Sequence, residues 1–167
     1  MKITSKDTLI DKIQKLYPEA IARIKPVIIR MLILVHATAV KLIQRGPHTE
    51  YRKYRRRSIV HWSSAPGEPP ASDTGALASS IQWHLAKNGL EGTVGTNLAY
   101  GRYLEYGALL RGTGSGRNAK GQYERTGILY PRPWLRPALL ANRPKIVKAV
   151  EKVLHETIVK RHGRHRG

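Results

Sequence analysis

Carboxylate side chains are the usual basis of acid–base or metal-dependent catalysis, and this chain has 11 Asp and Glu in 167 residues. In the middle of the chain they stand singly, in predicted loops or at the ends of predicted elements: Glu50, Glu68, Asp73, Glu91, Glu105 and Glu124. A nuclease that cuts with a metal ion needs at least two carboxylates that grip the same cation. No two of these acids share a helix face at i, i+4, so the pattern disfavours a small nuclease.

Two other patterns resemble ligand sites but lack the rest of the motif. His155, His162 and His165 lie near the end of the chain, the last two in a Gly- and Arg-rich tail, whereas a closed zinc site needs firmly held ligands. The GTGSG stretch at 112–116 lacks the Gly-Lys-Ser/Thr ending of a phosphate-binding loop. We therefore predict no catalytic residue, no metal site and no cofactor.

The net charge is the most unusual property of the composition. Thirty Lys and Arg against 11 Asp and Glu give +19, which favours polyanionic surroundings such as nucleic acid. Five of these charges fall within six residues, next to Tyr51 and Tyr54: Arg52, Lys53, Arg55, Arg56 and Arg57. This basic cluster can neutralise phosphates while the tyrosines stack on bases, it can pair with an acidic protein surface, or it is a solvated charge run. No base-reading motif accompanies it, so nucleic-acid contact would be independent of sequence.

Cysteine is absent, which excludes disulfides and thiolate catalysis. Met1–Leu9 lacks the apolar core of a secretory signal. Val27–Val35 is apolar apart from Arg30, but it is about half as long as the roughly 20 residues that a membrane span needs. We expect a buried helix there and no membrane partner.

A long helix is predicted in the N-terminal part, because apolar residues recur at three- and four-residue spacing from Ile21 to Leu42. It should begin or kink near Pro26 and end at Gly46-Pro47, after a separate leading helix over Thr4–Leu16.

The C-terminal part is also predicted to be helical. Apolar residues at helical spacing indicate a helix that starts after Pro133 or Pro137, is divided at Pro144 and runs to about Lys160.

Strands and turns occupy the middle of the chain. Asn88-Gly89 is a strong hairpin signal between two predicted strands. The predicted elements are strands over Ser58–Ser63, Ile81–Leu85 and Leu90–Gly95, a short helix over Ala99–Tyr106, a Gly-rich mobile loop over Leu110–Gln122 and a strand within Tyr123–Tyr130. In the strand over Ile81–Leu85 we expect Ile81, Trp83 and Leu85 to form the buried side.

The order of elements predicts an α+β fold, in which an antiparallel β-sheet packs with a long N-terminal helix and a C-terminal helix. We predict a single domain over residues 1–160. Its parts are a helical region 1–45, strands, a short helix and loops over 58–130, and the C-terminal helix 133–160, followed by a basic disordered tail over 161–167.

The segment Ser64–Ile81, SAPGEPPASDTGALASSI, is a stiff arm followed by a helical turn. Prolines restrict the backbone around them to extended conformations. Directly after them, Asp73 or Thr74 can cap a turn through Ala76–Ser80. We expect a segment of this kind to lie across a neighbouring surface in one conformation.

Three segments in this order resemble the head–tail joining, or tail-completion, proteins of long-tailed bacteriophages: Ser64–Ile81, VGTNLAYGRYLEYG at Val94–Gly107, and RPWLRPALL at Arg132–Leu140. The resemblance covers about Ser58 to Leu154, and the region Met1–Leu42 fits only as the leading helix of that family. Two features depart from the family pattern, namely the long Gly-rich loop after Gly107 and the extended basic tail.

The resemblance implies a non-enzymatic structural subunit of the phage neck, located in the virion and, during assembly, in the host cytoplasm. Its partners would be copies of itself in a ring (six favoured, twelve possible), a head-side connector or stopper protein, a tail terminator or tail-tube protein, and the genomic DNA that passes through the lumen. A head-to-tail contact closes into a ring when its rotation fits. The basic cluster would face this DNA or acidic neighbours.

The resemblance also implies roles for single residues. The subunit-contact arm would be Pro66, Gly67, Glu68, Pro69 and Pro70. A structural signature, whose aromatic residues would pack against the RPWLRP segment, would comprise Thr74, Gly75, Leu77, Gly95, Thr96, Asn97, Tyr100, Tyr103, Glu105, Tyr106, Gly107, Trp134 and Leu135. The alternative function, suggested by charge alone, is a nucleic-acid-binding protein that acts through its basic surface without sequence preference.

Overall fold

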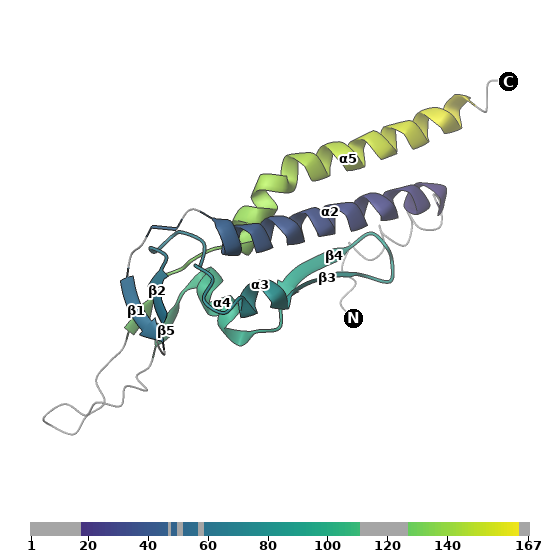
Figure 1. Ribbon diagram of the computed structural model, residues 1–167. Helices are drawn as coiled ribbons and strands as arrows, with labels where there is room; N and C mark the ends of the chain where they lie inside the picture. The colour runs from purple at the N-terminus through teal and green to yellow at the C-terminus, as the bar shows by residue number, and fades with distance from the viewer. Residues whose placement is uncertain (1–17, 47, 50–51, 57–58, 111–126, 164–167) are drawn as a thin grey trace, which may run out of the picture. The chain divides into compact units, whose positions relative to one another are not determined.

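The computed structural model describes residues 18–46, 48–49, 52–56, 59–110 and 127–163 (Figure 1). The predicted leading helix, nearly all of the Gly-rich loop and the last four residues lie outside this range. In chain order the elements are α2 (Pro18–Arg45), β1 (Arg52–Arg56), β2 (Ile59–Ser63), α3 (Ala76–Ser80), β3 (Ile81–Leu85), β4 (Gly92–Thr96), α4 (Ala99–Tyr106), β5 (Ala108–Leu110), β6 (Gly127–Leu129) and α5 (Leu135–Gly163). The predicted α+β class is confirmed.

The chain forms two compact units. The first contains the described residues of 1–35, 83–93 and 140–167, and the second consists of those within 36–82 and 94–139. Helices α2 and α5 each contribute residues to both units. All the functional contacts described below lie within the second unit.

Helix α2 is continuous from Pro18 to Arg45, and Pro26 lies inside it, so the helix does not begin near Pro26 as one prediction allowed. A proline inside a helix removes one backbone hydrogen bond, and the helix continues where packing stabilises it. The buried side chains are Ile24, Leu32, Val35, Ala39 and Ile43, which are again spaced by three, four or eight residues. The predicted end is confirmed, because Gly46 N–H donates to the Leu42 carbonyl at 3.0 Å just past the last helical residue.

Within α2, the stretch Ile21–Arg45 is long and apolar enough to cross a membrane, with a mean hydropathy of 1.9 over an 18-residue window of which 22% is buried. No other helix in the described part of the chain passes this test. This test considers only the length and composition of a helix, and the core helix of a soluble protein passes the same test.

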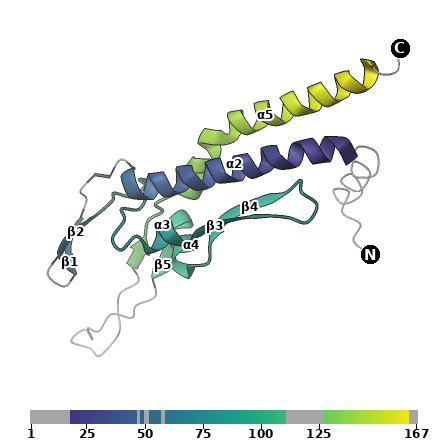
Figure 2. The ribbon, with the colours of Figure 1, turned by 45° about the vertical axis from the view of Figure 1, so that its right-hand side comes forward.

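Strands β3 and β4 form the predicted hairpin. The hairpin runs along α2 in both views (Figures 1 and 2). Its turn uses the Asn88 side chain, whose Oδ1 accepts the Leu90 N–H at 3.0 Å, and Gly89 at a φ of 71°. Gly92 lets the hairpin approach α2, since a Cβ there would lie 2.5 Å from Leu32 Cδ1. Trp83, predicted on the buried side of β3, is 39% exposed.

The strands pair as three separate two-stranded sheets in the described residues, β1–β2, β3–β4 and β5–β6, and not as the single sheet predicted. Strand β1 is an unpredicted element, because RKYRR has no alternation of apolar and polar residues. It is held by antiparallel pairing with β2, from Arg52 opposite Ser63 to Arg56 opposite Ile59. Backbone hydrogen bonds form regardless of side-chain charge, which explains why a basic run can be a strand.

Helix α5 begins at Leu135, close to its predicted start, and Pro144 does not divide it. The helix also continues through Gly163, into the segment predicted to be a disordered tail. Leu139 and Leu154 of its predicted apolar face are 49% and 39% exposed. The buried apolar residues of the second unit come from α2, α3, β3, the start of α5 and the residue directly before α5: Ala39, Ile43, Leu77, Ala78, Ile81, Trp134 and Ala138.

Candidate functional site

The Glu68 side chain fastens the proline arm to other parts of the same chain. Glu68 Oε2 accepts the backbone N–H of Thr49 and that of Ala65, both at 2.9 Å, and Oε1 accepts the Thr49 hydroxyl. Gly67 N–H donates to the Pro131 carbonyl at 2.8 Å, with Gly67 at a φ of 86°. The arm is therefore ordered by contacts at both of its sides before any partner binds.

Exposure differs along the arm. Pro70 is buried and Pro69 is half-buried, whereas Pro66 and Gly67 are exposed. Only the first part of the predicted contact arm is thus presented to solvent, and Pro70 supports the fold.

The hydrogen bonds to Glu68 have a consequence for pH. The Thr49 hydroxyl first, and then the backbone N–H groups of Thr49 and Ala65, hold the Glu68 pKa below its ordinary value of 4.5. A lowered folded-state pKa means that this contribution to stability is present above pH 4.5 and is lost as the pH falls through the folded pKa. We expect the Glu68 Cδ resonance to titrate below 4.5, and the stability difference between the natural chain and Glu68→Gln to shrink over that range. A Glu68 pKa at or above 4.5 would contradict this.

The turn after the arm is α3, which begins as predicted at Ala76 but is not capped as predicted. Gly75 is the N-cap residue at a φ of 74°, and Thr74 Oγ1 accepts the Ala76 N–H at a long 3.4 Å. Asp73 instead pairs with His61 of β2, with Oδ1 and Nδ1 3.0 Å apart. This pair ties the segment before α3 to β2.

The three segments of the resemblance converge at Gly101 of α4. A Cβ on Gly101 would lie 2.5 Å from Thr96 Cγ2, 3.3 Å from Leu77 Cδ1 and 3.8 Å from Trp134 Cζ2. The Thr96 side chain is fixed there, because its Oγ1 is 2.6 Å from Ser80 Oγ and accepts the Leu98 N–H at 3.1 Å. Gly101 was not predicted as a signature residue, although side chains of all three segments meet there.

Glu105 connects α4 to the start of α5. This carboxylate is 8% exposed and accepts three backbone N–H groups: Trp134 at 2.8 Å and Leu135 at 2.9 Å on Oε2, and Arg136 at 2.9 Å on Oε1. The first N–H groups of a helix have no partner within it, and the helix dipole favours a negative charge there. Glu105 thus caps α5 from 30 residues away in the sequence.

The aromatic residues of α4, which the resemblance implies pack against the RPWLRP segment, are largely exposed. Tyr100, Tyr103 and Tyr106 are 43%, 49% and 76% exposed. The opposite side of the short helix, with Gly101 and Glu105, contacts Trp134, whose Nε1–H lies 3.4 Å from the Gly101 carbonyl. The correction follows from helix geometry, because residues at i, i+3 and i+6 share one side and Gly101 and Glu105 lie on another.

The exposed tyrosines continue into an apolar surface on β5 and β6. Leu109 and Ile128 are directly opposite each other in this pair, and are 75% and 59% exposed. Tyr130, directly after β6, is 54% exposed. We call Tyr103, Tyr106, Leu109, Ile128 and Tyr130 the Tyr106 surface. Exposed apolar side chains on neighbouring elements make this surface a candidate for a protein–protein contact.

The remaining signature residues take different positions. Asn97 is exposed, and a Cβ on Gly95 would have no atom within 4 Å. Gly107 has a φ of 77° and closes α4, donating its N–H to the Tyr103 carbonyl at 2.8 Å.

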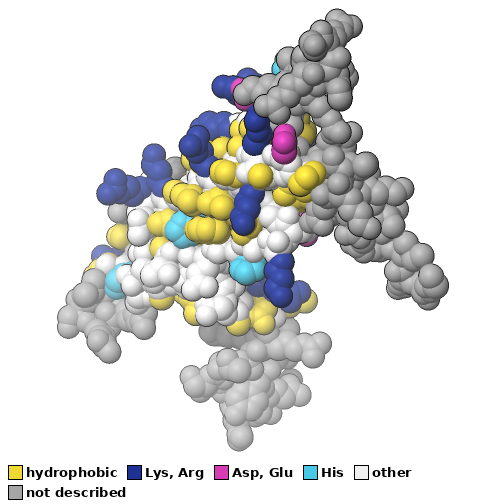
Figure 3. Space-filling model, turned by 90° about the vertical axis from the view of Figure 1, so that its right-hand side faces the viewer, with side chains coloured by type: hydrophobic (Ala, Val, Ile, Leu, Met, Phe, Trp, Pro, Cys, Tyr) yellow, Lys and Arg dark blue, Asp and Glu magenta, His cyan; other side chains and the backbone are white. Residues whose placement is uncertain are grey.

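Four members of the basic cluster, Arg52, Arg55, Arg56 and Arg57, have side chains outside the described residues, and Lys53 is exposed with Nζ 5.7 Å from the centre of the Trp62 ring. Figure 3 shows Lys and Arg side chains spread among exposed hydrophobic ones on one face, with few Asp or Glu.

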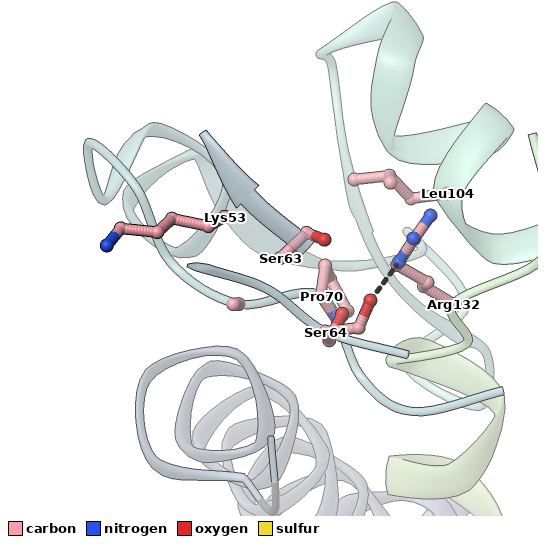
Figure 4. Close-up of a pocket in the computed structure, with 7 residues that line it drawn as sticks. Lys53, Ser63, Ser64, Pro70, Leu104 and Arg132 are labelled. Atoms are coloured by element: carbon pink, nitrogen blue, oxygen red, sulfur yellow. Dashed lines mark hydrogen bonds between the residues drawn. The ribbon is translucent and has the colours of Figure 1, made fainter. Parts of the chain in front are cut away.

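A pocket of about 480 Å³ lies beside the arm (Figure 4). Its lining residues are Lys53, Ser63, Ser64, Pro70, Ala71, Leu104 and Arg132. Arg132 joins the elements around it, since its Nε–H donates to the Ser64 carbonyl at 3.1 Å and its backbone N–H donates to the Leu104 carbonyl at 2.6 Å. Neither Ser64 nor Arg132 was predicted as a site residue, because their roles depend on contacts 68 and 28 residues apart. Among the described residues, no group of three His, Cys, Asp or Glu could hold a metal ion.

Comparisons with known proteins give one finding. A family described as "Bacteriophage HK97-gp10, putative tail-component" matches residues 7–107. Two of the three segments of the resemblance lie inside this match, and Arg132–Leu140 lies beyond it. Neither the curated proteins nor the solved structures contained a match. Since the match spans more than half of the 167 residues, the chain belongs to the HK97-gp10-like family of bacteriophage tail components, structural proteins of the virion.

Proposed function

We propose that the protein is a subunit of the phage neck, which joins the DNA-filled head to the tail as a closed ring of copies and lets the genome pass. Family membership supports a role in the virion. The observation that carries the finer proposal is the Tyr106 surface, which the described part of the chain leaves uncovered. Tyrosine is enriched at the centres of protein–protein interfaces, and three of the five side chains of this surface are tyrosines.

The Tyr106 surface and the exposed part of the arm are the two halves that we assign to the head-to-tail contact. A ring requires that one patch of a subunit meets a different patch of the next. Pro66 and Gly67 form the second patch, because they are exposed and the hydrogen bonds of Gly67 and Glu68 already hold the arm in place. Such prior ordering lowers the entropy lost on docking.

The DNA path in this proposal is supported by charge. A net charge of +19 is strongly attractive to DNA, and a ring of six copies, the number we favour over twelve, would surround its lumen with positive potential. Strand β1 would then face the lumen or an acidic part of the connector, stopper or tail-terminator protein.

Assembly of a Tyr106→Ser, Leu109→Ser double variant tests this proposal. Each anchor at the centre of an interface contributes roughly 2 kcal/mol, so we expect the ring to be lost by light scattering and electron microscopy. The melting temperature of the isolated chain should stay unchanged, because both side chains are mostly exposed.

Trp83→Ser is the matched control, an exposed aromatic residue on β3 outside the Tyr106 surface, and it should assemble normally. A double variant that forms rings as well as the natural chain would remove the Tyr106 surface from the contact. A natural chain that never assembles, alone or in particles, would overturn the ring itself.

The second candidate function is sequence-independent binding of nucleic acid by the free chain, and the +19 charge favours it. This function requires tight binding of DNA by the monomer, with a log–log salt slope of about −0.9 for each phosphate neutralised. If the chain assembles into rings but its DNA binding at moderate salt is negligible, the result would favour the neck role over free nucleic-acid binding.

A further inference from the structure

We propose that the pocket beside the arm binds the carboxylate of an acidic side chain presented by another protein. The pocket lies wholly within the second unit, between the end of β2, the arm and α4. The identity of the presenting protein, a neighbouring virion component, rests on the proposed function. The binding chemistry does not.

The first observation that supports this proposal is the environment of the Ser64 hydroxyl. The residue is 1% exposed, and its Oγ has no hydrogen-bond partner among the described residues. Buried hydroxyls nearly always have a partner, because leaving one without a partner costs free energy. The side chains of Pro70, Ala71 and Leu104, which also line the pocket, have no polar atom that could serve as one. The hydroxyl has almost no exposed surface as it stands, so a carboxylate in the pocket would supply the missing acceptor when the Ser64 side chain turns toward it.

The second observation is the fixed position of the Arg132 guanidinium group. Its Nε–H and its backbone N–H are both engaged, with Ser64 and Leu104, so the guanidinium is held in one place. Figure 4 shows it between these two residues. The forked arrangement of guanidinium N–H groups matches the two oxygens of a carboxylate. No Asp or Glu lines the pocket to neutralise this charge.

A protein carboxylate fits better than a DNA phosphate. Lys53 also lines the pocket, but Figure 4 shows its ammonium group directed away from Ser64 and Arg132, so one cation serves the site. One positive charge matches a carboxylate. A phosphate in a DNA backbone carries a sugar on each side and cannot enter as far as a buried hydroxyl, whereas a Glu or Asp side chain ends in its carboxylate and has an apolar stem for Pro70 and Leu104.

The test is a titration of the full ¹⁵N-labelled chain with N-acetyl-glutamate α-amide, followed by nuclear magnetic resonance. We expect saturable shifts of the Ser64, Ala65 and Ala71 amides, which N-acetyl-glutamine amide, the neutral analogue, should not produce. Arg132→Gln should weaken binding about tenfold or more, and Ser64→Ala by a few-fold, in line with charged and neutral hydrogen bonds. Arg136→Gln and Ser72→Ala, both at exposed positions outside the pocket, are the matched controls and should bind normally.

The melting temperature separates binding from folding. Ser64→Ala removes a hydroxyl without a partner, so the variant should melt at or above the temperature of the natural chain while it binds the probe more weakly. Unchanged binding by folded Ser64→Ala, or the absence of saturable shifts in the natural chain, would overturn the proposal. Inorganic phosphate that binds as tightly as the glutamate probe would overturn the choice of a protein carboxylate. The titration does not require an assembled ring. Carboxylate binding can therefore be absent while rings form, and it can be present while rings do not form, so the two proposals are tested separately.

Discussion

Glu105→Ala is expected to lower the free energy of unfolding by about 3 kcal/mol or more, because three buried or half-buried backbone N–H groups lose their acceptor together. These groups belong to Trp134, directly before α5, and to the first two residues of the helix, where the helix dipole makes the loss of a negative charge more costly. The substitution also leaves a void beside Trp134, which is 2% exposed. The effect should therefore exceed that of an ordinary helix cap.

Chemical denaturation of the isolated chain measures this loss. Glu105→Gln keeps one oxygen acceptor and loses the charge, so its effect should be smaller, about 1 to 2 kcal/mol. Glu91→Ala, at an exposed position in the β3–β4 turn, is the control and should change stability by at most about 0.5 kcal/mol. If Glu105→Ala were as stable as Glu91→Ala, the carboxylate would not hold the start of α5.

Gly107→Ala is the second substitution for which we expect a large effect, also about 3 kcal/mol. Gly107 has a φ of 77° and a ψ of 170°, a region that is essentially restricted to glycine and costs other residues about 1–3 kcal/mol. An added Cβ would lie 2.8 Å from the Leu129 carbonyl oxygen and 3.1 Å from Pro131 Cδ. Since the first of these is backbone, the contact is relieved only if β6 moves, which adds a similar cost.

Alanine substitutions at two other glycines distinguish the cost of backbone strain from the cost of steric contact with the added Cβ. Gly67 has a φ of 86° with no atom within 4 Å of an added Cβ, so Gly67→Ala should show the strain alone. A Cβ on Gly95 would have no neighbour within 4 Å, and Gly95 has no positive φ, so Gly95→Ala should change stability by about 0.5 kcal/mol or less. Equal unfolding free energies for the alanine variants at 107 and 95 would contradict the argument for Gly107.

Predictions from the sequence succeeded where the signal is local. Gly46-Pro47 marks the end of α2, Asn88-Gly89 marks the β3–β4 turn, and the bounds of α4 agree with the predicted Ala99–Tyr106. In each case a few adjacent residues determine the backbone conformation through their own φ preferences and side-chain hydrogen bonds.

Predictions that needed a partner distant in the chain were less successful. Strand β1 has no pattern of its own and exists through pairing with β2. The resemblance implied that the tyrosines of α4 pack against the Trp134 segment, yet these tyrosines are largely exposed, and the small Gly101 and the acidic Glu105 contact that segment. Residue type predicts burial only on average, and a short helix can turn either side toward its neighbours.

The same division applies to the carboxylates and other polar residues of the candidate site. From the sequence by itself one can determine that the acids stand singly, that the chain carries +19, that the fold is α+β, and that three ordered segments resemble phage tail-completion proteins. Only the tertiary structure decides that Glu105 caps α5, that Glu68 fastens the arm, and that Ser64 and Arg132 share a pocket. The reason is physical, because each of these roles depends on backbone groups up to 68 residues away. The residues adjacent in the sequence do not determine which of these distant groups come together on folding.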